Sequence, residues 1–133
     1  MNLPEITVVA ALIYNSKNQI LITLRPKGFH LSGLWEFPGG KVEDGESYPN
    51  ALIREIKEET NLDINVGDLY WEEKVAYTKK RVHLYFYRCE LTRKDQQVVC
   101  HDVDDYRWVY KNELNDFNFP EADKALIDHI MGT

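Results

Sequence analysis

The chain has 133 residues, of which 16 are basic and 22 acidic, giving a formal charge of −6, and 44% of its residues are hydrophobic. This composition fits one globular domain over residues 1–133. The negative charge argues against binding to polymeric nucleic acid, which depends on basic side chains that neutralise phosphates. No apolar stretch approaches the roughly 20 residues needed to cross a bilayer, and the N-terminus does not resemble a signal peptide. We therefore expect a cytoplasmic protein with no membrane partner and with free thiols at Cys89 and Cys100.

The first third of the sequence is rich in extended-chain signals. Ile6–Tyr14 is dominated by Val, Ile and Ala and predicts a buried strand. Asn15–Asn18 is a polar turn, and Ile20–Arg25 predicts a second strand, so the two strands are expected to form a hairpin. A loop is predicted over Pro26–Gly33, followed by a short extended segment over Leu34–Phe37.

A glycine pair precedes the first predicted helix. The extended segment stops at Pro38-Gly39-Gly40, where consecutive glycines are expected to form a tight turn and to let the backbone approach a ligand closely. Ser47–Thr60 predicts a helix, because it begins with a capping serine, has a proline in its first turn and carries apolar residues at helical spacing.

The second half of the sequence alternates between strand and helix signals. Three further strands are predicted near Ile64–Tyr77, which we expect to be interrupted, Val82–Leu91 and Tyr106–Val109. A second helix is predicted from about Pro120 to Ile130 because apolar residues recur on one side. This order of elements favours an α+β fold, a mixed α/β/α sandwich.

Three carboxylates gather on the first predicted helix. At about 100° per residue, Glu55, Glu58 and Glu59 fall within an arc of roughly 100° on one side. A solvated acidic face is the ordinary explanation of such a run. The alternative is a metal site, since Mg²⁺ and Mn²⁺ prefer oxygen ligands such as carboxylates, and the glycine pair and the loop residues Glu43 and Glu46 lie just upstream.

The spacing of these residues resembles that of a known family. Gly40, Glu46, the run Arg54-Glu55-Ile56 and the pair Glu58-Glu59 stand where the Nudix box has its glycine, glutamates and arginine. The one departure is Asn61 where the family has glycine, a position that is expected to be left-handed and that asparagine tolerates. The segment from Leu34 to Glu43 is similar to MutT-type nucleoside triphosphate pyrophosphohydrolases, and the likeness covers nearly all of the chain. It implies the Nudix fold, a mixed central sheet flanked by helices.

This resemblance also implies roles for individual residues. Glu55, Glu58, Glu59 and the carbonyl of Gly40 would bind divalent ions, Mg²⁺ with Mn²⁺ as a possible substitute. Arg54 would orient the carboxylates through a forked pair with Glu46. The general base is left open between Glu55 and Asp102, for which a solvated loop carboxylate is the alternative.

The substrate would be a small nucleotide, contacted by five residues whose ordinary alternatives are surface charge or core packing. Arg25 and Lys41 would hold phosphates or the base, Phe37 and Tyr77 would stack on the base, and Asp123 stands where relatives read its edge. The cationic segment Lys79–Arg81 is better explained as an exposed hairpin tip.

Several functions share this chemistry. The leading expectation is hydrolysis of a (deoxy)nucleoside triphosphate to monophosphate and pyrophosphate, removing oxidised nucleotides such as 8-oxo-dGTP from the pool that supplies DNA synthesis. The enzyme alternatives are hydrolysis of CTP or 5-methyl-dCTP and of dihydroneopterin triphosphate. A non-catalytic Nudix-like binding module is disfavoured because all four box glutamates are present. Either a monomer or a homodimer is compatible with the sequence.

Overall fold

The computed structural model describes residues 3–28 and 33–133, so part of the predicted loop Pro26–Gly33 lies outside the described residues. The strands are β1 (Glu5–Tyr14), β2 (Ile20–Leu24), β3 (Trp35–Glu36), β4 (Gly39–Lys41), β5 (Ile64–Ala76), β6 (Arg81–Leu91) and β7 (Asp105–Val109). The helices are α1 (Tyr48–Thr60), the 3-10 turns η1 (Lys111–Asp116) and η2 (Glu121–Asp123), and α2 (Lys124–Met131).

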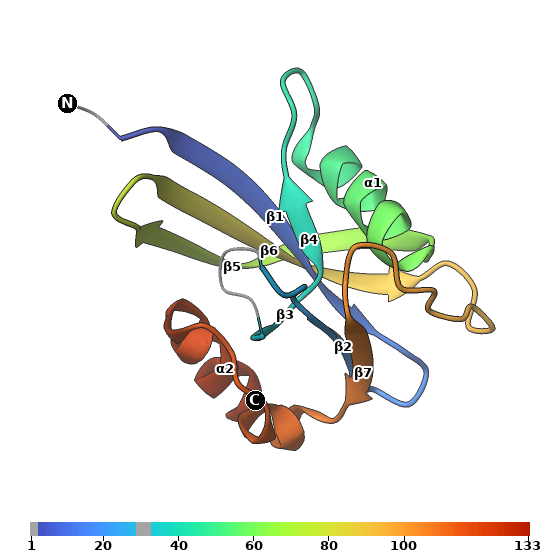
Figure 1. The fold of residues 1–133 in the computed structure, drawn as a ribbon. Coiled ribbons are helices and arrows are strands. Elements are labelled where there is room, and N and C mark those ends of the chain that lie inside the picture. Colours follow the sequence, from blue (N-terminus) through green and yellow to red (C-terminus); the bar gives the residue numbers. More distant parts are fainter. Residues whose placement is uncertain (1–2, 29–32) are drawn as a thin grey trace.

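The strands form one mixed sheet in the order β3-β2-β1-β6-β5, with β4 paired to β1 and β7 paired to β2 (Figure 1). The central pair β1–β6 is parallel over its whole length, whereas the other pairs are antiparallel. The α+β class, with a mixed sheet between helices, is therefore confirmed.

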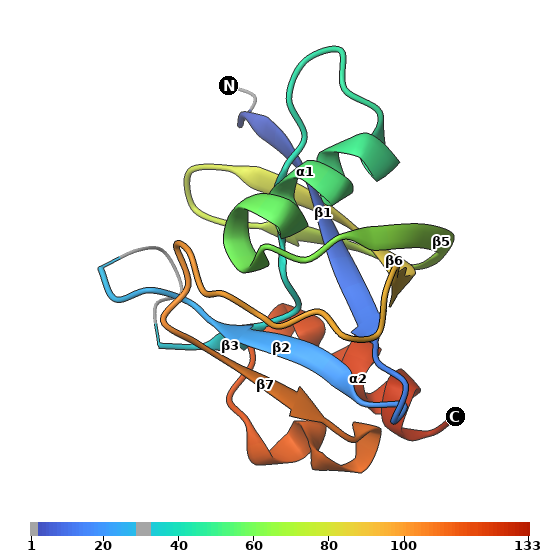
Figure 2. The same ribbon diagram turned by 90° about the vertical axis from the view of Figure 1, so that its right-hand side faces the viewer.

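Two hydrophobic cores lie on opposite faces of the sheet, one with α1 and the other with α2. Figure 2 shows these two helices on either side of the sheet. Alternate residues of β1 serve both, because successive side chains of a strand point to opposite faces. Val9 and Ala11 pack with the inner side of α1, whereas Ala10 and Leu12 pack with the apolar side of α2. Among the described residues, no helix is long and apolar enough to cross a membrane.

The expected hairpin between the first two strands is mostly absent. β1 and β2 are paired in register only at Tyr14 and Ile20, next to the turn. Beyond that point β1 pairs with β6 and β4, while β2 pairs with β7 and β3. β1 thus pairs over its length with β6, which is distant in sequence, and not with its sequence neighbour β2. Local turn signals do not reveal such long-range pairing.

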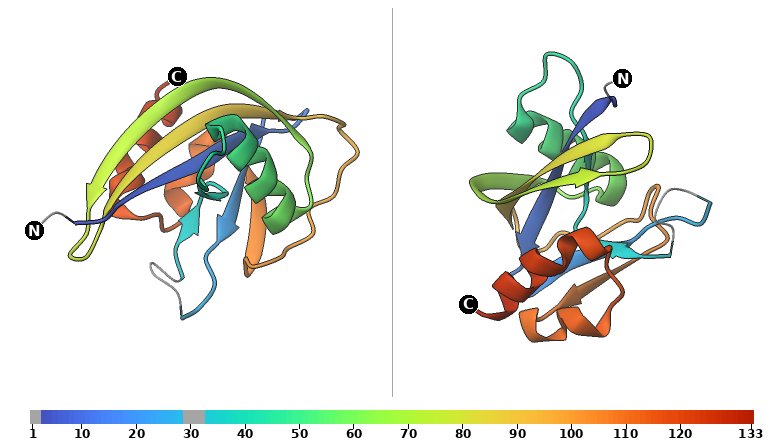
Figure 3. Two further views of the ribbon diagram at one scale, coloured as in Figure 1. Left: turned by 90° about the horizontal axis from the view of Figure 1, so that it is seen from above. Right: turned by 90° about the vertical axis from the view of Figure 1, so that its left-hand side faces the viewer.

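Two other predicted elements differ in detail. The predicted helix from Pro120 is divided into the 3-10 turn η2 and the helix α2, with Asp123 at the junction. The interruption expected in Ile64–Tyr77 takes the form of register shifts between Val66 and Trp71 within one continuous β5. These irregularities accompany the strong curvature of the β5–β6 ribbon, seen from above in Figure 3.

Candidate active site

Helix α1 is capped at both ends, which fixes the residues at which it begins and ends. The Ser47 hydroxyl accepts a hydrogen bond of 3.2 Å from the Asn50 backbone N–H. At the other end, Asn61 adopts φ 61° and donates its N–H to the Lys57 carbonyl at 3.0 Å. The left-handed conformation expected at the one departure from the family pattern is thus present.

The glycines before α1 do not form the predicted tight turn. Gly39 and Gly40 belong to β4, and the described glycines with positive φ lie elsewhere. Their small size matters because of what stands beside them. A Cβ on Gly39 would lie 2.0 Å from the Val9 carbonyl oxygen, and a Cβ on Gly40 would lie 2.3 Å from the Glu55 carboxylate. These glycines therefore allow β4 to approach both β1 and α1.

Glu59 is the most buried of the three predicted metal ligands. Its Oε1 accepts a hydrogen bond of 3.1 Å from the Gly39 N–H. Burial raises its pKa to about 8, and the nearby carboxylates of Glu36 and Glu55 add to the shift. Burial also raises the pKa of Glu55. A bound cation would reduce the repulsion between these partly buried carboxylates.

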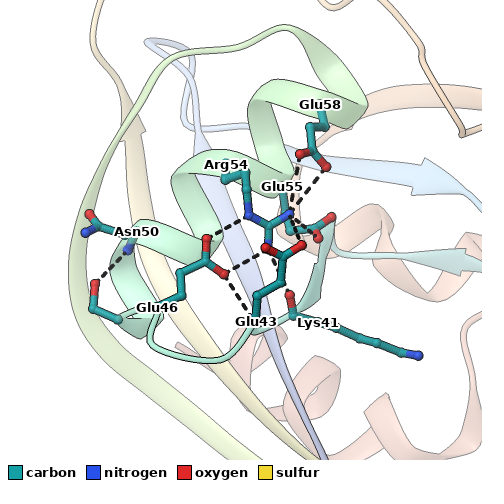
Figure 4. A network of polar contacts seen from close by, with 8 residues as sticks. Lys41, Glu43, Glu46, Asn50, Arg54, Glu55 and Glu58 are labelled. Atoms are coloured by element: carbon teal, nitrogen blue, oxygen red, sulfur yellow. Dashed lines mark hydrogen bonds and ion pairs between the residues drawn. The ribbon is translucent and has the colours of Figure 1, made fainter.

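Arg54 organises the exposed part of the acidic cluster (Figure 4). Its guanidinium makes the expected forked pair with Glu46, at 2.7 and 2.9 Å, and this pairing lowers the pKa of Glu46 to about 2. The same guanidinium donates to Glu55 at 2.9 Å, to Glu58 at 3.4 Å and to the Lys41 carbonyl at 3.1 Å. One arginine thus joins the loop after β4 to two of the predicted ligands.

The donor set fits a hard divalent cation, although its side chains are not gathered around one point. Among residues 3–28 and 33–133, no three His, Cys, Asp or Glu side chains converge as a ready ligand cluster. Glu55 and Glu58 turn toward Arg54, and Glu59 turns toward Gly39. Three carboxylates and the carbonyl of Gly40 supply the oxygen ligands that Mg²⁺ and Mn²⁺ prefer.

A cavity of about 720 Å³ opens beside this cluster. Its walls come from β1, β4, β6, the turn η2 with the residue before it, and the segment before β7. The lining includes most of the residues singled out from the sequence: Arg25, Phe37, Gly40, Lys41, Glu59, Tyr77, Asp102 and Asp123. Arg54, Glu55 and Glu58 are not part of the lining, so Gly40 and Glu59 connect the acidic cluster to the cavity.

The cationic and aromatic residues of the cavity have different surroundings. Arg25 forms an ion pair of 2.9 Å with Glu36, whose pKa burial nevertheless raises to about 7. Phe37 is only 3% exposed and packs edge-on against Phe86, so its ring belongs mainly to the core. Tyr77 lines the cavity, and burial and then the charge of Asp123 raise the pKa of its phenol.

Asp102 lies on a constrained loop at the rim of the cavity. It is exposed and adopts φ 59°, a conformation that is uncommon outside glycine. The loop is held on both sides, because the N–H of His101 donates to the Glu59 carbonyl at 2.8 Å and that of Asp104 donates to the Leu24 carbonyl at 3.0 Å. Asp102 is thereby tied to the end of the helix that carries the acidic cluster.

Two carboxylates near the cavity were not singled out from the sequence. Glu36 holds Arg25 against the cavity wall. Glu73 lies on β5 and faces Asp123, as described below. The available signal was strand alternation, since Glu73 has the same parity as Trp71 and the cavity-lining Val75 and so points to the same side of the strand.

Comparison with known proteins agrees with this geometry. The sequence model of the NUDIX domain matches residues 9–129. An 8-oxo-dGTP diphosphatase of Buchnera aphidicola subsp. Schizaphis graminum is 34% identical over 115 residues, covering 86% of this chain and 85% of that protein. A CTP pyrophosphohydrolase of Escherichia coli is 32% identical and covers 95% and 91% of the two chains. The crystal structure of a MutT protein from Methanosarcina mazei superposes with a TM-score of 0.88 at 25% identity, covering 98% and 95%. The chain therefore belongs to the Nudix family and is a MutT-type Nudix hydrolase, an enzyme that acts on pyrophosphate bonds and depends on a divalent metal.

Proposed function

We propose that this protein hydrolyses a (deoxy)nucleoside triphosphate to the monophosphate and pyrophosphate with Mg²⁺ as its ion, and that 8-oxo-dGTP is the leading substrate. The observation that carries the proposal is that Gly40 and Glu59 belong both to the acidic cluster and to the wall of a nucleotide-sized cavity. A base held in the cavity would place its phosphates next to the carboxylates. Relatives named 8-oxo-dGTP diphosphatase support this choice of substrate.

The reaction breaks one phosphoanhydride bond. The oxygen of water bonds to the β-phosphorus, the bond from that phosphorus to the α–β bridging oxygen breaks, and the bridging oxygen leaves with the monophosphate. When bound, divalent ions would neutralise the charge of the polyphosphate and lower the pKa of the attacking water. Glu55, Glu58, Glu59 and the Gly40 carbonyl would hold them.

The chain's own groups would position these components and move the proton. Arg54 fixes Glu55 and Glu58 from one side through contacts of 2.9 and 3.4 Å. The attacking water must lose a proton, and we assign this role to Glu55 or Asp102, the two carboxylates that flank the site from α1 and from the loop before β7. The attachment of the Asp102 loop to the Glu59 carbonyl supports its inclusion.

The far end of the cavity would bind the base. Asp123 is 7% exposed and still lines the cavity, with Arg25 and Tyr77 beside it. A buried carboxyl at a cavity wall favours a ligand that offers matching hydrogen-bond donors. Lys41, exposed at the end of β4, is suited to contact phosphates, and the ring of Phe37 forms an apolar part of the wall.

A CTP-type substrate is the second candidate. It is favoured by the likeness to the Escherichia coli protein named CTP pyrophosphohydrolase, which is 32% identical over 126 residues. The two candidates use the same acidic cluster and differ in the base and sugar that the cavity accepts. We further propose that the enzyme acts in the cytoplasm on the free nucleotide.

A pyrophosphate-release screen tests the proposal. The purified protein with Mg²⁺ would be given ordinary deoxynucleoside triphosphates, CTP, 5-methyl-dCTP and 8-oxo-dGTP, with chelator controls. The expected result is metal-dependent release of pyrophosphate with the highest kcat/KM for 8-oxo-dGTP. A highest kcat/KM for CTP would select the second candidate, and no release from any triphosphate would overturn the proposal.

A further inference from the structure

A second buried carboxyl lies behind the cavity wall. Glu73 stands on the side of β5 that faces η2 and α2, and both of its carboxylate oxygens are shielded from solvent. The indole of Trp71 lies close enough to favour the charged form, but neither oxygen accepts a hydrogen bond of regular geometry among the described residues. A fully charged carboxylate in such a place would be expensive to desolvate.

The side chain that faces Glu73 is Asp123. Asp123 occupies the N-cap position of α2, yet its carboxyl makes no capping hydrogen bond to the helix. The turn η2 packs against β5, so the buried carboxyl of Asp123 and that of Glu73 are neighbours, and each shifts the pKa of the other through a side-chain hydrogen-bond interaction. Two carboxylates cannot make such a bond, because each is only an acceptor, so a bond between them requires a proton on one of the two.

The surroundings favour one negative charge on this pair. Burial raises the pKa of both Glu73 and Asp123, and the charge of Arg25 acts in the opposite direction on Asp123. The other titratable groups that face the pair are Glu36, which senses Asp123, and Tyr77, which senses both carboxyls. From α2, the imidazole of His129 packs with its ring centroid 5.1 Å from that of Trp71, the indole next to Glu73.

We propose that Glu73 is a positioning residue that shares one proton with Asp123 and thereby presents Asp123 to the cavity as a hydrogen-bond acceptor. The base selected by such an acceptor has two adjacent donors on one edge, as guanine-type bases have in N1–H and the 2-amino group. A cytosine edge, which offers one donor beside one acceptor, is matched less well. This inference rests on the proposed function, since it assigns the cavity to the base of the nucleotide.

The pH dependence of KM tests the shared proton. Raising the pH removes that proton, and the second charge then repels Asp123, so the wild-type KM for a guanine nucleotide should rise by about tenfold. In Glu73→Gln the amide N–H₂ replaces the protonated carboxyl as a permanent donor, and KM should remain within about twofold of its neutral value across the same pH range. Glu72→Gln, on the opposite side of β5, is the matched control and should follow the wild-type profile.

Two results of this experiment would overturn the inference. One is an alkaline rise in KM in Glu73→Gln that equals the wild-type rise. The other is a wild-type alkaline effect confined to kcat, because a base-positioning pair acts on binding.

A titration that needs no activity separates this inference from the proposed function. Carboxyl NMR of the metal-free protein should show Glu73 titrating above the ordinary glutamate range, and Asp123→Asn should shift that midpoint. A Glu73 midpoint in the ordinary range would overturn the inference even if the enzyme hydrolyses nucleotides. A raised midpoint in a protein that releases no pyrophosphate would leave the pair in place and overturn the proposed function alone.

Discussion

The carboxylate of Glu55 fills the space that a side chain on Gly40 would need, since a Cβ at that glycine would lie 2.3 Å from the Glu55 Cδ and Oε2. Gly40→Ala should therefore displace a proposed metal ligand while leaving the strand backbone intact. Because a shift of about 1 Å at a reacting centre can cost roughly 100-fold in rate, we expect a loss of that order in kcat/KM. Kinetics and thermal unfolding on the same sample would measure the two effects.

The neighbouring glycine provides the matched comparison. A Cβ on Gly39 would lie 2.0 Å from the Val9 carbonyl oxygen, which is backbone and cannot move aside. Gly39→Ala should thus lower the free energy of unfolding by about 1–3 kcal/mol. If Gly40→Ala instead behaved like Gly39→Ala, with stability lost and residual folded enzyme fully active, the close approach of β4 to Glu55 would have no catalytic meaning.

Glu58→Gln probes the most exposed of the three proposed ligands. Glu58 is 55% exposed and its contact with Arg54 is long, 3.4 Å, so the substitution should hardly change stability. Loss of a charged ligand should lower kcat by at least about 100-fold and raise the Mg²⁺ concentration needed for half-maximal activity. Glu43→Gln, an exposed loop carboxylate 3.8 Å from Arg54, is the control and should retain near-normal turnover. Equal effects of the two substitutions would refute the assignment.

The pair between Glu46 and Arg54 predicts a particular acid response. Hydrogen bonding to Arg54 lowers the folded-state pKa of Glu46 to about 2, below the ordinary value of about 4.5, so the folded protein binds fewer protons than the unfolded chain between these values. The contribution of the pair to the free energy of unfolding is therefore complete at pH values above the ordinary glutamate pKa. It is lost as the pH falls toward 2. Side-chain NMR should place the Glu46 midpoint near 2, and Arg54→Ala should return it toward the ordinary value. A midpoint that the substitution leaves unchanged would contradict the paired geometry.

Asp123→Ala should change which base is preferred more than it changes the metal requirement. The cavity would lose its buried hydrogen-bond acceptor. Without that acceptor, the site could no longer distinguish strongly between bases that carry donors on the facing edge and bases that do not. We expect kcat/KM for the preferred nucleotide to fall by about 10- to 100-fold, with a smaller fall for poor substrates. The measurement is a substrate panel at several Mg²⁺ concentrations. An identical ranking of nucleotides in wild type and variant would remove Asp123 from base recognition.

The chemistry of α1 could be predicted from the sequence because it is local. The spacing of Glu55, Glu58 and Glu59 places them on one side of any helix, and Ser47 and Asn61 mark its ends. The part of the family resemblance that lies within this stretch is carried by the same residues. The expected pair of Arg54 with Glu46 ties this helix to the loop before it, and the structure adds the contacts of Arg54 with Glu58 and with the Lys41 carbonyl.

The cavity could not be predicted in the same way because it arises from contacts distant in sequence. β1 diverges from β2 and pairs instead with β6, whose residues stand 76 positions later in the chain, as Arg81 does opposite Glu5. Gly39 and Gly40 suggested a turn from composition alone, whereas their small size serves the packing of β4 between β1 and α1. Glu73 belongs to no recognisable sequence motif. Its importance depends on its being a neighbour of Asp123, a residue of another element.

The most direct test of the account is a crystal structure with Mg²⁺ and a non-hydrolysable nucleoside triphosphate analogue. The account predicts electron density for at least one ion ligated by side chains of Glu55, Glu58 or Glu59 and in contact with the phosphates, with the base in the cavity next to Asp123. Phosphates bound away from these carboxylates, with no ion among them, would contradict it.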